Sequence, residues 1–223
     1  MDYKKSTVII NGHPFEYEEE QLSLDTGKPI SEEDALYVLK LTKQLLNTKG
    51  INFYLYWGTL LGAVREKGII KGDEDVDVYI DEEEKFFSAI PYFYENGLKI
   101  IRIRPHYYYS FRAPNGYYID FYVVCPLRYS PWAWTCKRIN HYYQPKWIFE
   151  EHEEIDFLGE KFLCPKNPEK VLEVLYGPSW RVPMKGHHFP SEVKSAHIYH
   201  TIIAYVKRII HYDQLKKMIN NSK

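Results

Sequence analysis

Periodic and alternating apolar positions divide the first half of the chain into short helices and strands. A helix is expected to begin at the Ser31 cap, which three acidic residues follow, and to stop before Gly50. The aromatic and apolar run at 51–57 is typical of a buried strand, and a short helix is expected over 59–66. Residues 75–80 alternate acidic and apolar side chains, so they predict a strand whose two faces differ.

Aromatic strands dominate the middle of the pattern. Residues 82–95 have a helical spacing of apolar positions, and Pro91 is expected to end or kink that helix. Two of the strands that follow are joined through Asn115 and Gly116, which form a strong hairpin turn signal. The three expected strands read LKIIRIR, HYYYSFR and YYIDFYVV and occupy residues 98–104, 106–112 and 117–124.

The C-terminal half has a less regular pattern. Residues 125–150 are rich in aromatic side chains and proline without a clear period, so an irregular insertion is expected there. A second hairpin is expected to turn at 158–160, and Asn167-Pro168 begins a helix that ends at Gly177-Pro178. A long amphipathic helix follows from Ser191. The pattern predicts one α+β domain with a mixed β-sheet flanked by helices over residues 1–223, with a core over roughly 31–185 and the last helix over roughly 191–219.

Composition and charge narrow the class of protein. With 223 residues, of which 45% are hydrophobic, the chain can form a substantial core, and its net charge of −1 disfavours nucleic acid as a partner. The chain has no apolar stretch of membrane-spanning length, and its first residues lack a signal peptide's hydrophobic region, so a cytoplasmic location is expected. Three widely spaced cysteines fit reduced thiols there. A zinc site that joins them to His141 is disfavoured because no C-x-x-C spacing occurs.

Three carboxylates in and just before the strand expected at 75–80 carry the candidate chemistry. Asp73, Asp75 and Asp77 are two residues apart, so in an extended chain they share one face and repel one another. Mg²⁺, which prefers carboxylate and phosphate oxygens, relieves that repulsion. The alternative is a solvated acidic loop, since eight of the twelve residues from 73 to 84 are acidic. The strand is favoured because every second position is apolar, which places Val76, Val78 and Ile80 on a buried face.

A glycine-led turn precedes the acidic strand and fits a phosphate group. Gly58 permits a close backbone approach, and Thr59 opens a helix whose first N–H groups are free to bind an anion. Arg65, two turns further along, adds a forked donor for the same anion. The carboxylates and this turn together indicate a metal and pyrophosphate site.

These segments resemble the signature of the LicD/fukutin family of phosphotransferases, a branch of the polymerase-β-type nucleotidyltransferase superfamily. The family carries a G-T-L-L-G-x-x-R-x-x-G block followed by D-D-D-I-D-I, and this chain reads GTLLGAVREKG at 58–68 and DEDVDV at 73–78. Asp120, in YYIDFYVV, stands in the context of the superfamily's third carboxylate, and PKNPEKVLEVLYGPSW at 165–180 resembles the family's C-terminal block. Three blocks in the correct order, over roughly residues 31–185, are far more specific than any one of them.

The resemblance implies a nucleotidyltransferase-like fold and metal-dependent transfer of a phospho-alcohol group from a CDP-linked alcohol donor to a hydroxyl of a cell-surface glycan, which releases CMP. Asp75, Asp77 and Asp120 are then the catalytic residues, and Asp120 is either a metal ligand or the base that takes the acceptor's proton. Phosphocholine is the first choice of transferred group, while ribitol phosphate, glycerol phosphate and phosphoethanolamine need much the same site. The expected ligands of Mg²⁺, or of Mn²⁺ in its place, are Asp73, Asp75, Asp77 and Asp120.

Two other functions stay open. One is a nucleotidyltransferase that leaves the NMP on a small molecule or a protein and releases pyrophosphate. The other is a non-catalytic nucleotide-binding protein with a decayed site, which the intact carboxylates disfavour. The identity of the small product separates the first alternative from the phosphotransferase.

Further side chains are candidates for substrate binding. The chain has Lys71 and Gly72 where the family has Pro-Trp before the acidic triplet, so Lys71 is a candidate phosphate contact. Trp132 and Trp134, in the expected insertion, either form an aromatic cage for a choline group or pack in the core. Four polar residues near the C-terminal block either bind phosphate or belong to a solvated loop: Arg181, Lys185, His187 and His188.

The expected C-terminal helix allows two interpretations. An apolar stripe beside an excess of positive charge fits peripheral association with the inner face of the cytoplasmic membrane. Packing of the stripe on the helix's own domain is preferred. The stripe consists of Tyr199, Ile202, Ile203, Val206, Ile209 and Ile210, and the basic residues are Lys194, Lys207, Arg208, Lys216 and Lys217.

Overall fold

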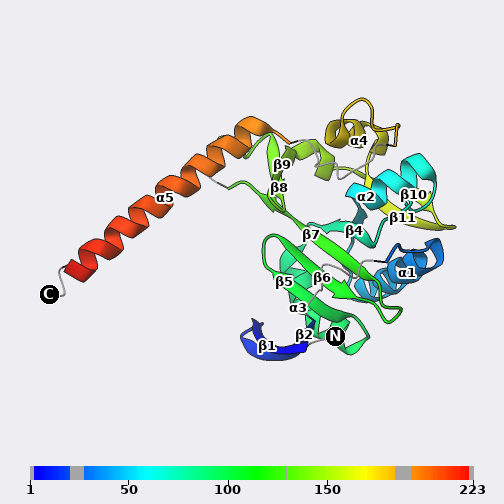
Figure 1. Ribbon diagram of the computed structural model, residues 1–223, viewed down its shortest axis with the longest axis horizontal. Coiled ribbons are helices and arrows are strands. Elements are labelled where there is room, and N and C mark those ends of the chain that lie inside the picture. The colour runs from blue at the N-terminus through cyan, green and yellow to red at the C-terminus, as the bar shows by residue number, and fades with distance from the viewer. Residues whose placement is uncertain (1–2, 21–27, 129, 184–191, 221–223) are drawn as a thin grey trace.

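The computed structural model describes residues 3–20, 28–128, 130–183 and 192–220, and it has an α+β fold built on a mixed β-sheet (Figure 1). The main path of this seven-stranded sheet has the order β3-β4-β7-β6-β5, and β8 and β9 extend it from β7. β4 and β7 are parallel neighbours, whereas the other pairs of this sheet are antiparallel. The expected mixed sheet is confirmed. Its strands are β3 (Tyr54–Leu55), β4 (Asp75–Ile80), β5 (Lys99–Arg104), β6 (Tyr108–Arg112), β7 (Tyr118–Pro126), β8 (Cys136–Ile139) and β9 (Tyr142–Pro145).

Helices flank the sheet, and two hairpins lie outside it (Figure 1). The helical segments are α1 (Glu32–Thr48), α2 (Trp57–Leu61), the π-helical η1 (Gly62–Glu66), α3 (Glu83–Glu95), the 3₁₀ segment η2 (Lys146–Phe149), α4 (Pro168–Tyr176) and α5 (Lys194–Asn220). The separate hairpins are β1 (Tyr3–Ile10) with β2 (His13–Glu20), and β10 (His152–Phe157) with β11 (Glu160–Pro165). The hairpin expected to turn at 158–160 is therefore confirmed.

Helix α1 begins and ends where its sequence signals predict. The Ser31 hydroxyl accepts a hydrogen bond from the Asp34 backbone N–H at 3.1 Å, which satisfies one free donor of the first turn. The helix ends at Thr48, and its inner face buries Val38, Leu39 and Leu46 completely. Local capping and apolar spacing agree here with the tertiary packing.

Pro91 was expected to end or kink helix α3, and it does not end it. The helix continues to Glu95 with Pro91 inside it. Proline removes one backbone hydrogen bond, but Phe86, Ile90 and Phe93 of the same helix are fully buried. The Phe86 ring lies 4.8 Å from that of Phe121 on β7, so packing on the sheet outweighs the lost bond.

Before the glycine-led turn the strand is shorter than expected, and the helix that follows begins two residues earlier than expected. Within 51–57 only Tyr54–Leu55 pairs as a strand, because the chain already turns into α2 at Trp57. The helix expected over 59–66 is α2 followed by the π-helical segment Gly62–Glu66. Trp57 has a positive φ of 40°, an uncommon conformation for a bulky residue, and it sets the sharp entry into the helix.

Two regions contain hairpins that the sequence analysis did not predict. The stretch 125–150 is not irregular throughout, since β8 and β9 form a hairpin that turns at Asn140, which has a positive φ of 50°. Aromatic side chains on β9 obscured the alternation that marks a strand. The hairpin of β1 and β2 turns at Asn11 and Gly12, both with positive φ, as in the Asn-Gly signal of a tight turn.

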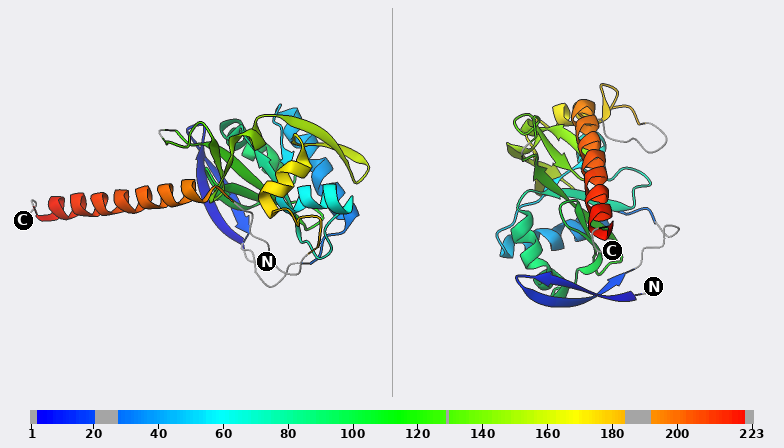
Figure 2. Two further views of the ribbon diagram at one scale, coloured as in Figure 1. Left: turned by 90° about the horizontal axis from the view of Figure 1, so that it is seen from above. Right: turned by 90° about the vertical axis from the view of Figure 1, so that its left-hand side faces the viewer.

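Helix α5 extends away from the rest of the molecule (Figures 1 and 2), and the expectation that its apolar stripe packs on its own domain is wrong for Ile202 and Val206, which are exposed. Its first turns pack: Ala196 is buried and the His200 ring stacks on Tyr143 with centroids 4.8 Å apart. Further along, Ile202 and Tyr205 are 56% and 66% exposed. Among the described residues, no helix combines the length and the apolar character that a membrane span requires. Peripheral membrane association through α5 stays a prediction.

Buried apolar side chains between Ile10 and Trp180 form one continuous core. A second small cluster of Leu127, Cys136 and Ala196 joins the insertion to the start of α5. The assignment of the whole chain to a single domain stays a prediction, and so does the cytoplasmic location.

Candidate active site

Two parallel strands bring three carboxylates together at the centre of the sheet. Asp77 on β4 is the direct register partner of Asp120 on β7, and Asp75 faces Tyr118 two pairs earlier. Oxygen atoms of Asp75, Asp77 and Asp120 all lie within 4.8 Å of one another, so these three residues are called the acidic triad below. The intervening apolar residues of β4 are fully buried, as the alternation predicted.

The start of α2 is bonded to β4 at Asp77. The Gly58 backbone N–H donates to the Asp77 carboxylate, and the Thr59 hydroxyl accepts from the Asp77 backbone N–H at 2.8 Å. These polar groups of Gly58 and Thr59 position the Asp77 residue, and the expectation that the two residues hold a pyrophosphate stays a prediction. A side chain at position 58 would also approach the Asp77 carboxylate, since an added Cβ would lie 3.1 Å from Asp73 Oδ2 and 3.3 Å from Asp77 Oδ2.

Gly58→Ala is therefore expected to weaken divalent-metal binding between about 10- and 100-fold while the fold persists, because carboxylates can rotate away from a methyl group. Gly62→Ala is the contrasting variant: its Cβ would meet the Gly68 carbonyl oxygen at 2.6 Å, so a loss of thermal stability is expected there. Mn²⁺ titration followed by electron paramagnetic resonance measures the first effect, and the melting temperature measures the second. Unchanged Mn²⁺ affinity in Gly58→Ala would exclude the face beside Gly58 from the metal site.

Asp120 is held by side chains from three strands. Arg102 Nη2 on β5 lies 3.9 Å from Asp120 Oδ2, and the Tyr122 hydroxyl donates to the same oxygen at 3.3 Å. Ser110 on β6 is its direct cross-strand neighbour. Asp120 itself is 6% exposed, and the Ser110 hydroxyl is near enough to lower its pKa, although among the described residues its buried Oδ1 has no hydrogen bond of standard geometry. A buried acceptor of this kind fits a metal ligand or a proton acceptor.

The electrostatics of the acidic triad are those of a cation site. Burial, and after it the charges of Asp120 and Asp73, raise the pKa of Asp75 to about 7. Burial and the charge of Asp75 raise the pKa of Asp77 well above its usual range, and burial also raises the pKa of Asp120. Without a cation, ionisation of the triad is unfavourable. A set of ligands made only of carboxylate oxygens fits a hard divalent cation.

Tyrosine hydroxyl groups lie beside the triad. The Tyr118 hydroxyl donates to Asp75. Tyr176, at the end of α4, lies close enough to Asp77 for that carboxylate to help raise its pKa. The Tyr-Gly pair of the C-terminal block, read only as a motif, therefore marks a residue beside the site.

Trp57 is a further residue that sequence reasoning missed. Its ring centroid lies 4.0 Å from that of Tyr122 and 5.8 Å from that of Tyr142. Its indole Nε1 is buried and has no acceptor among the described residues. Its place directly before Gly58 was the one available signal.

Other predicted binding residues lie apart or are otherwise engaged. Arg65 donates a hydrogen bond to the Glu66 carboxylate at 2.7 Å. It also donates to the Trp180 carbonyl oxygen at 3.2 Å, which links η1 to the C-terminal block. Trp134 is 86% exposed, while Trp132 packs on the small cluster of Leu127, Cys136 and Ala196. Lys71 is exposed in the turn before β4. Lys185, His187 and His188 lie outside the described residues.

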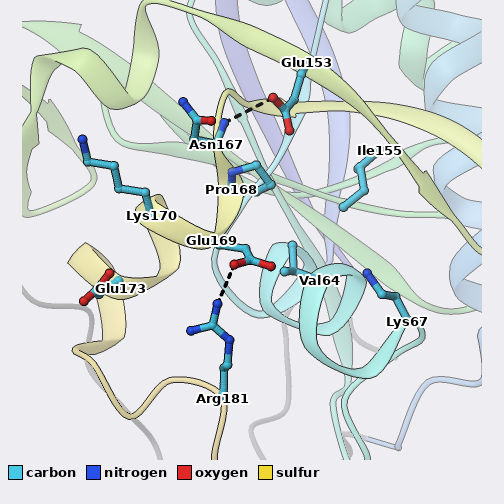
Figure 3. A pocket seen from close by; sticks show the side chains of 10 residues that line it. All are labelled: Val64, Lys67, Glu153, Ile155, Asn167, Pro168, Glu169, Lys170, Glu173 and Arg181. Carbon is cyan, nitrogen blue, oxygen red and sulfur yellow. Dashed lines mark hydrogen bonds and ion pairs between the residues drawn. The ribbon is translucent and has the colours of Figure 1, made fainter.

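Arg181 lines a cavity of about 590 Å³ that is separate from the acidic triad (Figure 3). It forms an ion pair with Glu169, and the Asn167 backbone N–H donates to Glu153 across the same cavity. The cavity lies between η1, β10 and α4. Its lining residues are Val64, Lys67, Glu153, Ile155, Asn167, Pro168, Glu169, Lys170, Glu173 and Arg181.

A carboxylate triad on neighbouring strands beside a glycine-led helix fits a divalent metal ion. Residues 50–167 match the model of the LicD/FKTN/FKRP nucleotidyltransferase-domain family, and the chain belongs to this family. The expected family relationship is confirmed.

Curated relatives extend well beyond the matched region. An uncharacterised protein of Rickettsia typhi is 29% identical over 180 residues, which cover 76% of this chain and 51% of the relative. The ribitol-5-phosphate transferase FKTN of Mus musculus is 28% identical over 157 residues, which cover 66% of this chain and 33% of that protein. The human FKTN protein is 27% identical over the same length and coverage. The chain thus spans between a third and about half of these relatives.

Among solved structures, the lincomycin-bound lincosamide antibiotic adenylyltransferase LnuA aligns with a TM-score of 0.44 and 14% identity. The alignment covers 65% of this chain and 86% of that chain.

Proposed function

We propose that this protein transfers a polyol phosphate, with ribitol 5-phosphate as the first candidate, from a CDP-linked donor to a hydroxyl group of a glycan and releases CMP. The observation that carries the proposal is the acidic triad within a chain of the LicD/FKTN/FKRP family. The donor and the polyol are suggested by the ribitol-5-phosphate transferases among its relatives.

The residues of β4 and the start of α2 form the metal site in the proposed reaction. Asp75 and Asp77 hold Mg²⁺, or Mn²⁺ in its place, with Asp73 beside them as a further acidic group. When bound, the cation neutralises charge on the donor's pyrophosphate. Gly58 and Thr59 keep Asp77 in position through its carboxylate and its backbone N–H.

Asp120 accepts the proton in the proposed reaction. The acceptor's hydroxyl oxygen attacks the phosphorus that carries the polyol, the bond from that phosphorus to the bridging oxygen breaks, and CMP leaves. The hydroxyl proton passes to Asp120, because burial raises the pKa of this carboxyl group and so makes it a stronger base than an exposed one. Arg102 and Tyr122 hold the carboxylate by the same oxygen, Oδ2, and leave Oδ1 for the proton.

The groups near the triad fit a polyol better than choline, which was the first choice from sequence. A trimethylammonium group needs open aromatic faces, but the Trp57 and Tyr122 rings pack on each other with centroids 4.0 Å apart. Polyol hydroxyls instead need hydrogen-bonding partners, and the Trp57 Nε1 and the hydroxyls of Tyr118 and Tyr122 are such groups. Trp134, on the exposed surface, offers no enclosed cage.

The test measures CMP release from CDP-ribitol, CDP-glycerol, CDP-choline and CDP-ethanolamine with Mg²⁺ and without glycan, when water takes the place of the acceptor. CDP-ribitol is expected to be hydrolysed fastest, and Trp132→Ala and Trp134→Ala are expected to leave the order of donors unchanged. Fastest release from CDP-choline, lost in either Trp variant, would instead restore the choline assignment. Pyrophosphate release from nucleoside triphosphates without CMP release would favour the nucleotidyltransferase alternative.

A further inference from the structure

A second cluster of metal-binding side chains lies away from the acidic triad. It joins Glu83 in the first turn of α3, His106 in the turn between β5 and β6, and Cys125 near the end of β7. One carboxylate oxygen, one ring nitrogen and the sulfur atom all lie within 4.8 Å of one another. Oxygen, nitrogen and sulfur donors converge here from three elements that are distant in sequence.

The cluster lies on the opposite face of the sheet from the triad. Successive side chains of a strand alternate between faces, so Cys125 shares the face of Phe121, whereas Asp120 points to the other. Phe121 packs against Phe86 of α3, which places Cys125 on the side that α3 covers. A ligand of this cluster is therefore separated from the acidic triad by the sheet itself.

Contacts around the cluster already orient its groups. Glu83 Oε2 lies 2.7 Å from His106 Nδ1, and the Tyr109 hydroxyl donates to Glu83 Oε1 at 2.7 Å. The Cys125 thiol donates to the His106 carbonyl oxygen at 3.3 Å. His106 has a positive φ of 67°, an uncommon conformation that turns its backbone N–H toward Glu83 Oε1.

We propose that Glu83, His106 and Cys125 form a binding site for a thiophilic divalent cation, with Zn²⁺ as the fitting ion. Zn²⁺ accepts carboxylate oxygen, imidazole nitrogen and thiolate sulfur in one tetrahedral site, whereas Mg²⁺ takes oxygen ligands. The carboxylate and the thiolate together balance its charge. The fourth position is open to water, because the His106 side chain is 72% exposed.

Binding requires two small changes in the cluster. Glu83 Oε2 and His106 Nδ1, which share a hydrogen bond, move apart so that both can bind the same ion. The Cys125 thiol loses its proton. The neighbouring Arg138 guanidinium is engaged by the carbonyl oxygens of His106 and Asn140 and by the Tyr107 ring, 4.5 Å away. The Tyr109 hydroxyl stays on Glu83 as an outer hydrogen bond that fixes the carboxylate.

Co²⁺ is the probe for this site, since it reports thiolate ligation directly. Titration of the metal-free full chain with Co²⁺, in excess Mg²⁺ to occupy oxygen sites, is expected to produce a near-ultraviolet sulfur-to-cobalt charge-transfer band that saturates at one equivalent. Zn²⁺ is expected to abolish the band and to raise the melting temperature, because an ion that binds only the folded chain stabilises it.

Variants identify the ligands. Cys125→Ser and His106→Ala are each expected to remove the band, while Cys136→Ala and His141→Ala are expected to keep it, because neither residue belongs to the cluster. The exposed His106 allows its replacement without a core defect, so the test does not depend on folding of the cysteine variant. A wild-type chain without the band, or a band that persists in His106→Ala or in a folded Cys125→Ser, would overturn the site and leave a hydrogen-bonded cluster only.

Discussion

Asp77→Asn is expected to lower CMP release from the preferred CDP-linked donor by about 10³-fold or more. The amide keeps the shape of the side chain but cannot balance the charge of a cation. Asp77 is also the direct register partner of Asp120, and its carboxylate accepts a hydrogen bond from the Gly58 backbone. No other residue of β4 makes both contacts, so none can replace it. The measurement is the initial rate of CMP formation at saturating Mg²⁺.

The same substitution is expected to stabilise the metal-free protein, which separates loss of chemistry from loss of fold. Burial and the charges of neighbouring carboxylates raise the pKa of Asp77, which means that its ionised form is unfavourable in the folded chain. A neutral amide at this position removes the electrostatic repulsion from these carboxylates. A gain of about 1 kcal/mol corresponds to a rise of about 2–4 °C in melting temperature for a chain of this size. Glu74→Gln, on the exposed neighbouring residue, is the matched control and should change neither quantity. An Asp77→Asn variant that folds and keeps wild-type turnover would remove Asp77 from the catalytic site.

The second large effect concerns how the stability of the metal-free protein depends on pH. The pKa of Asp75 is about 7 in the folded chain and near 4 in the unfolded chain. Between these values the folded state holds a proton that the unfolded state has released. The contribution of Asp75 to stability is therefore fully present below about pH 4 and is lost as pH rises through about 7. The size of the loss is on the order of 4 kcal/mol, from about 1.4 kcal/mol for each unit of pKa.

Asp75→Asn isolates this contribution from the other titrating groups. With chelator present, the difference in free energy of unfolding between Asp75→Asn and wild type is expected to grow in favour of the variant from pH 5 to pH 8. Saturating Mg²⁺ is expected to reverse the difference at pH 8, because only the wild type has the ionised ligand. Parallel stability curves for the two proteins from pH 5 to 8 would mean that Asp75 titrates at its ordinary pKa and is not part of a strained acidic site.

The sequence by itself determined the family and the first helix, and its four expected metal ligands included the three residues of the triad together with Asp73, which lies outside it. Capping at Ser31 and the alternation of Asp75 and Asp77 with buried valines are local signals, and local signals survive folding unchanged. Asp120 was also recognisable, although only by its resemblance to a superfamily pattern. The strand pairing that places it opposite Asp77 depends on contacts between segments far apart in the chain.

Only the tertiary structure decided the continuity of α3, the position of Trp57 and Cys125, and the direction of α5, because these features depend on packing between segments that are distant in sequence. Burial on the sheet keeps α3 helical through Pro91, and the face of the sheet separates Cys125 from the acidic triad. The position of Trp57 beside the site depends on the sharp turn into α2, and the spacing of apolar residues in the sequence does not predict that turn. The direction of α5 depends on the few contacts of its first turns, since a helical pattern specifies an apolar stripe but not the surface, if any, that covers it.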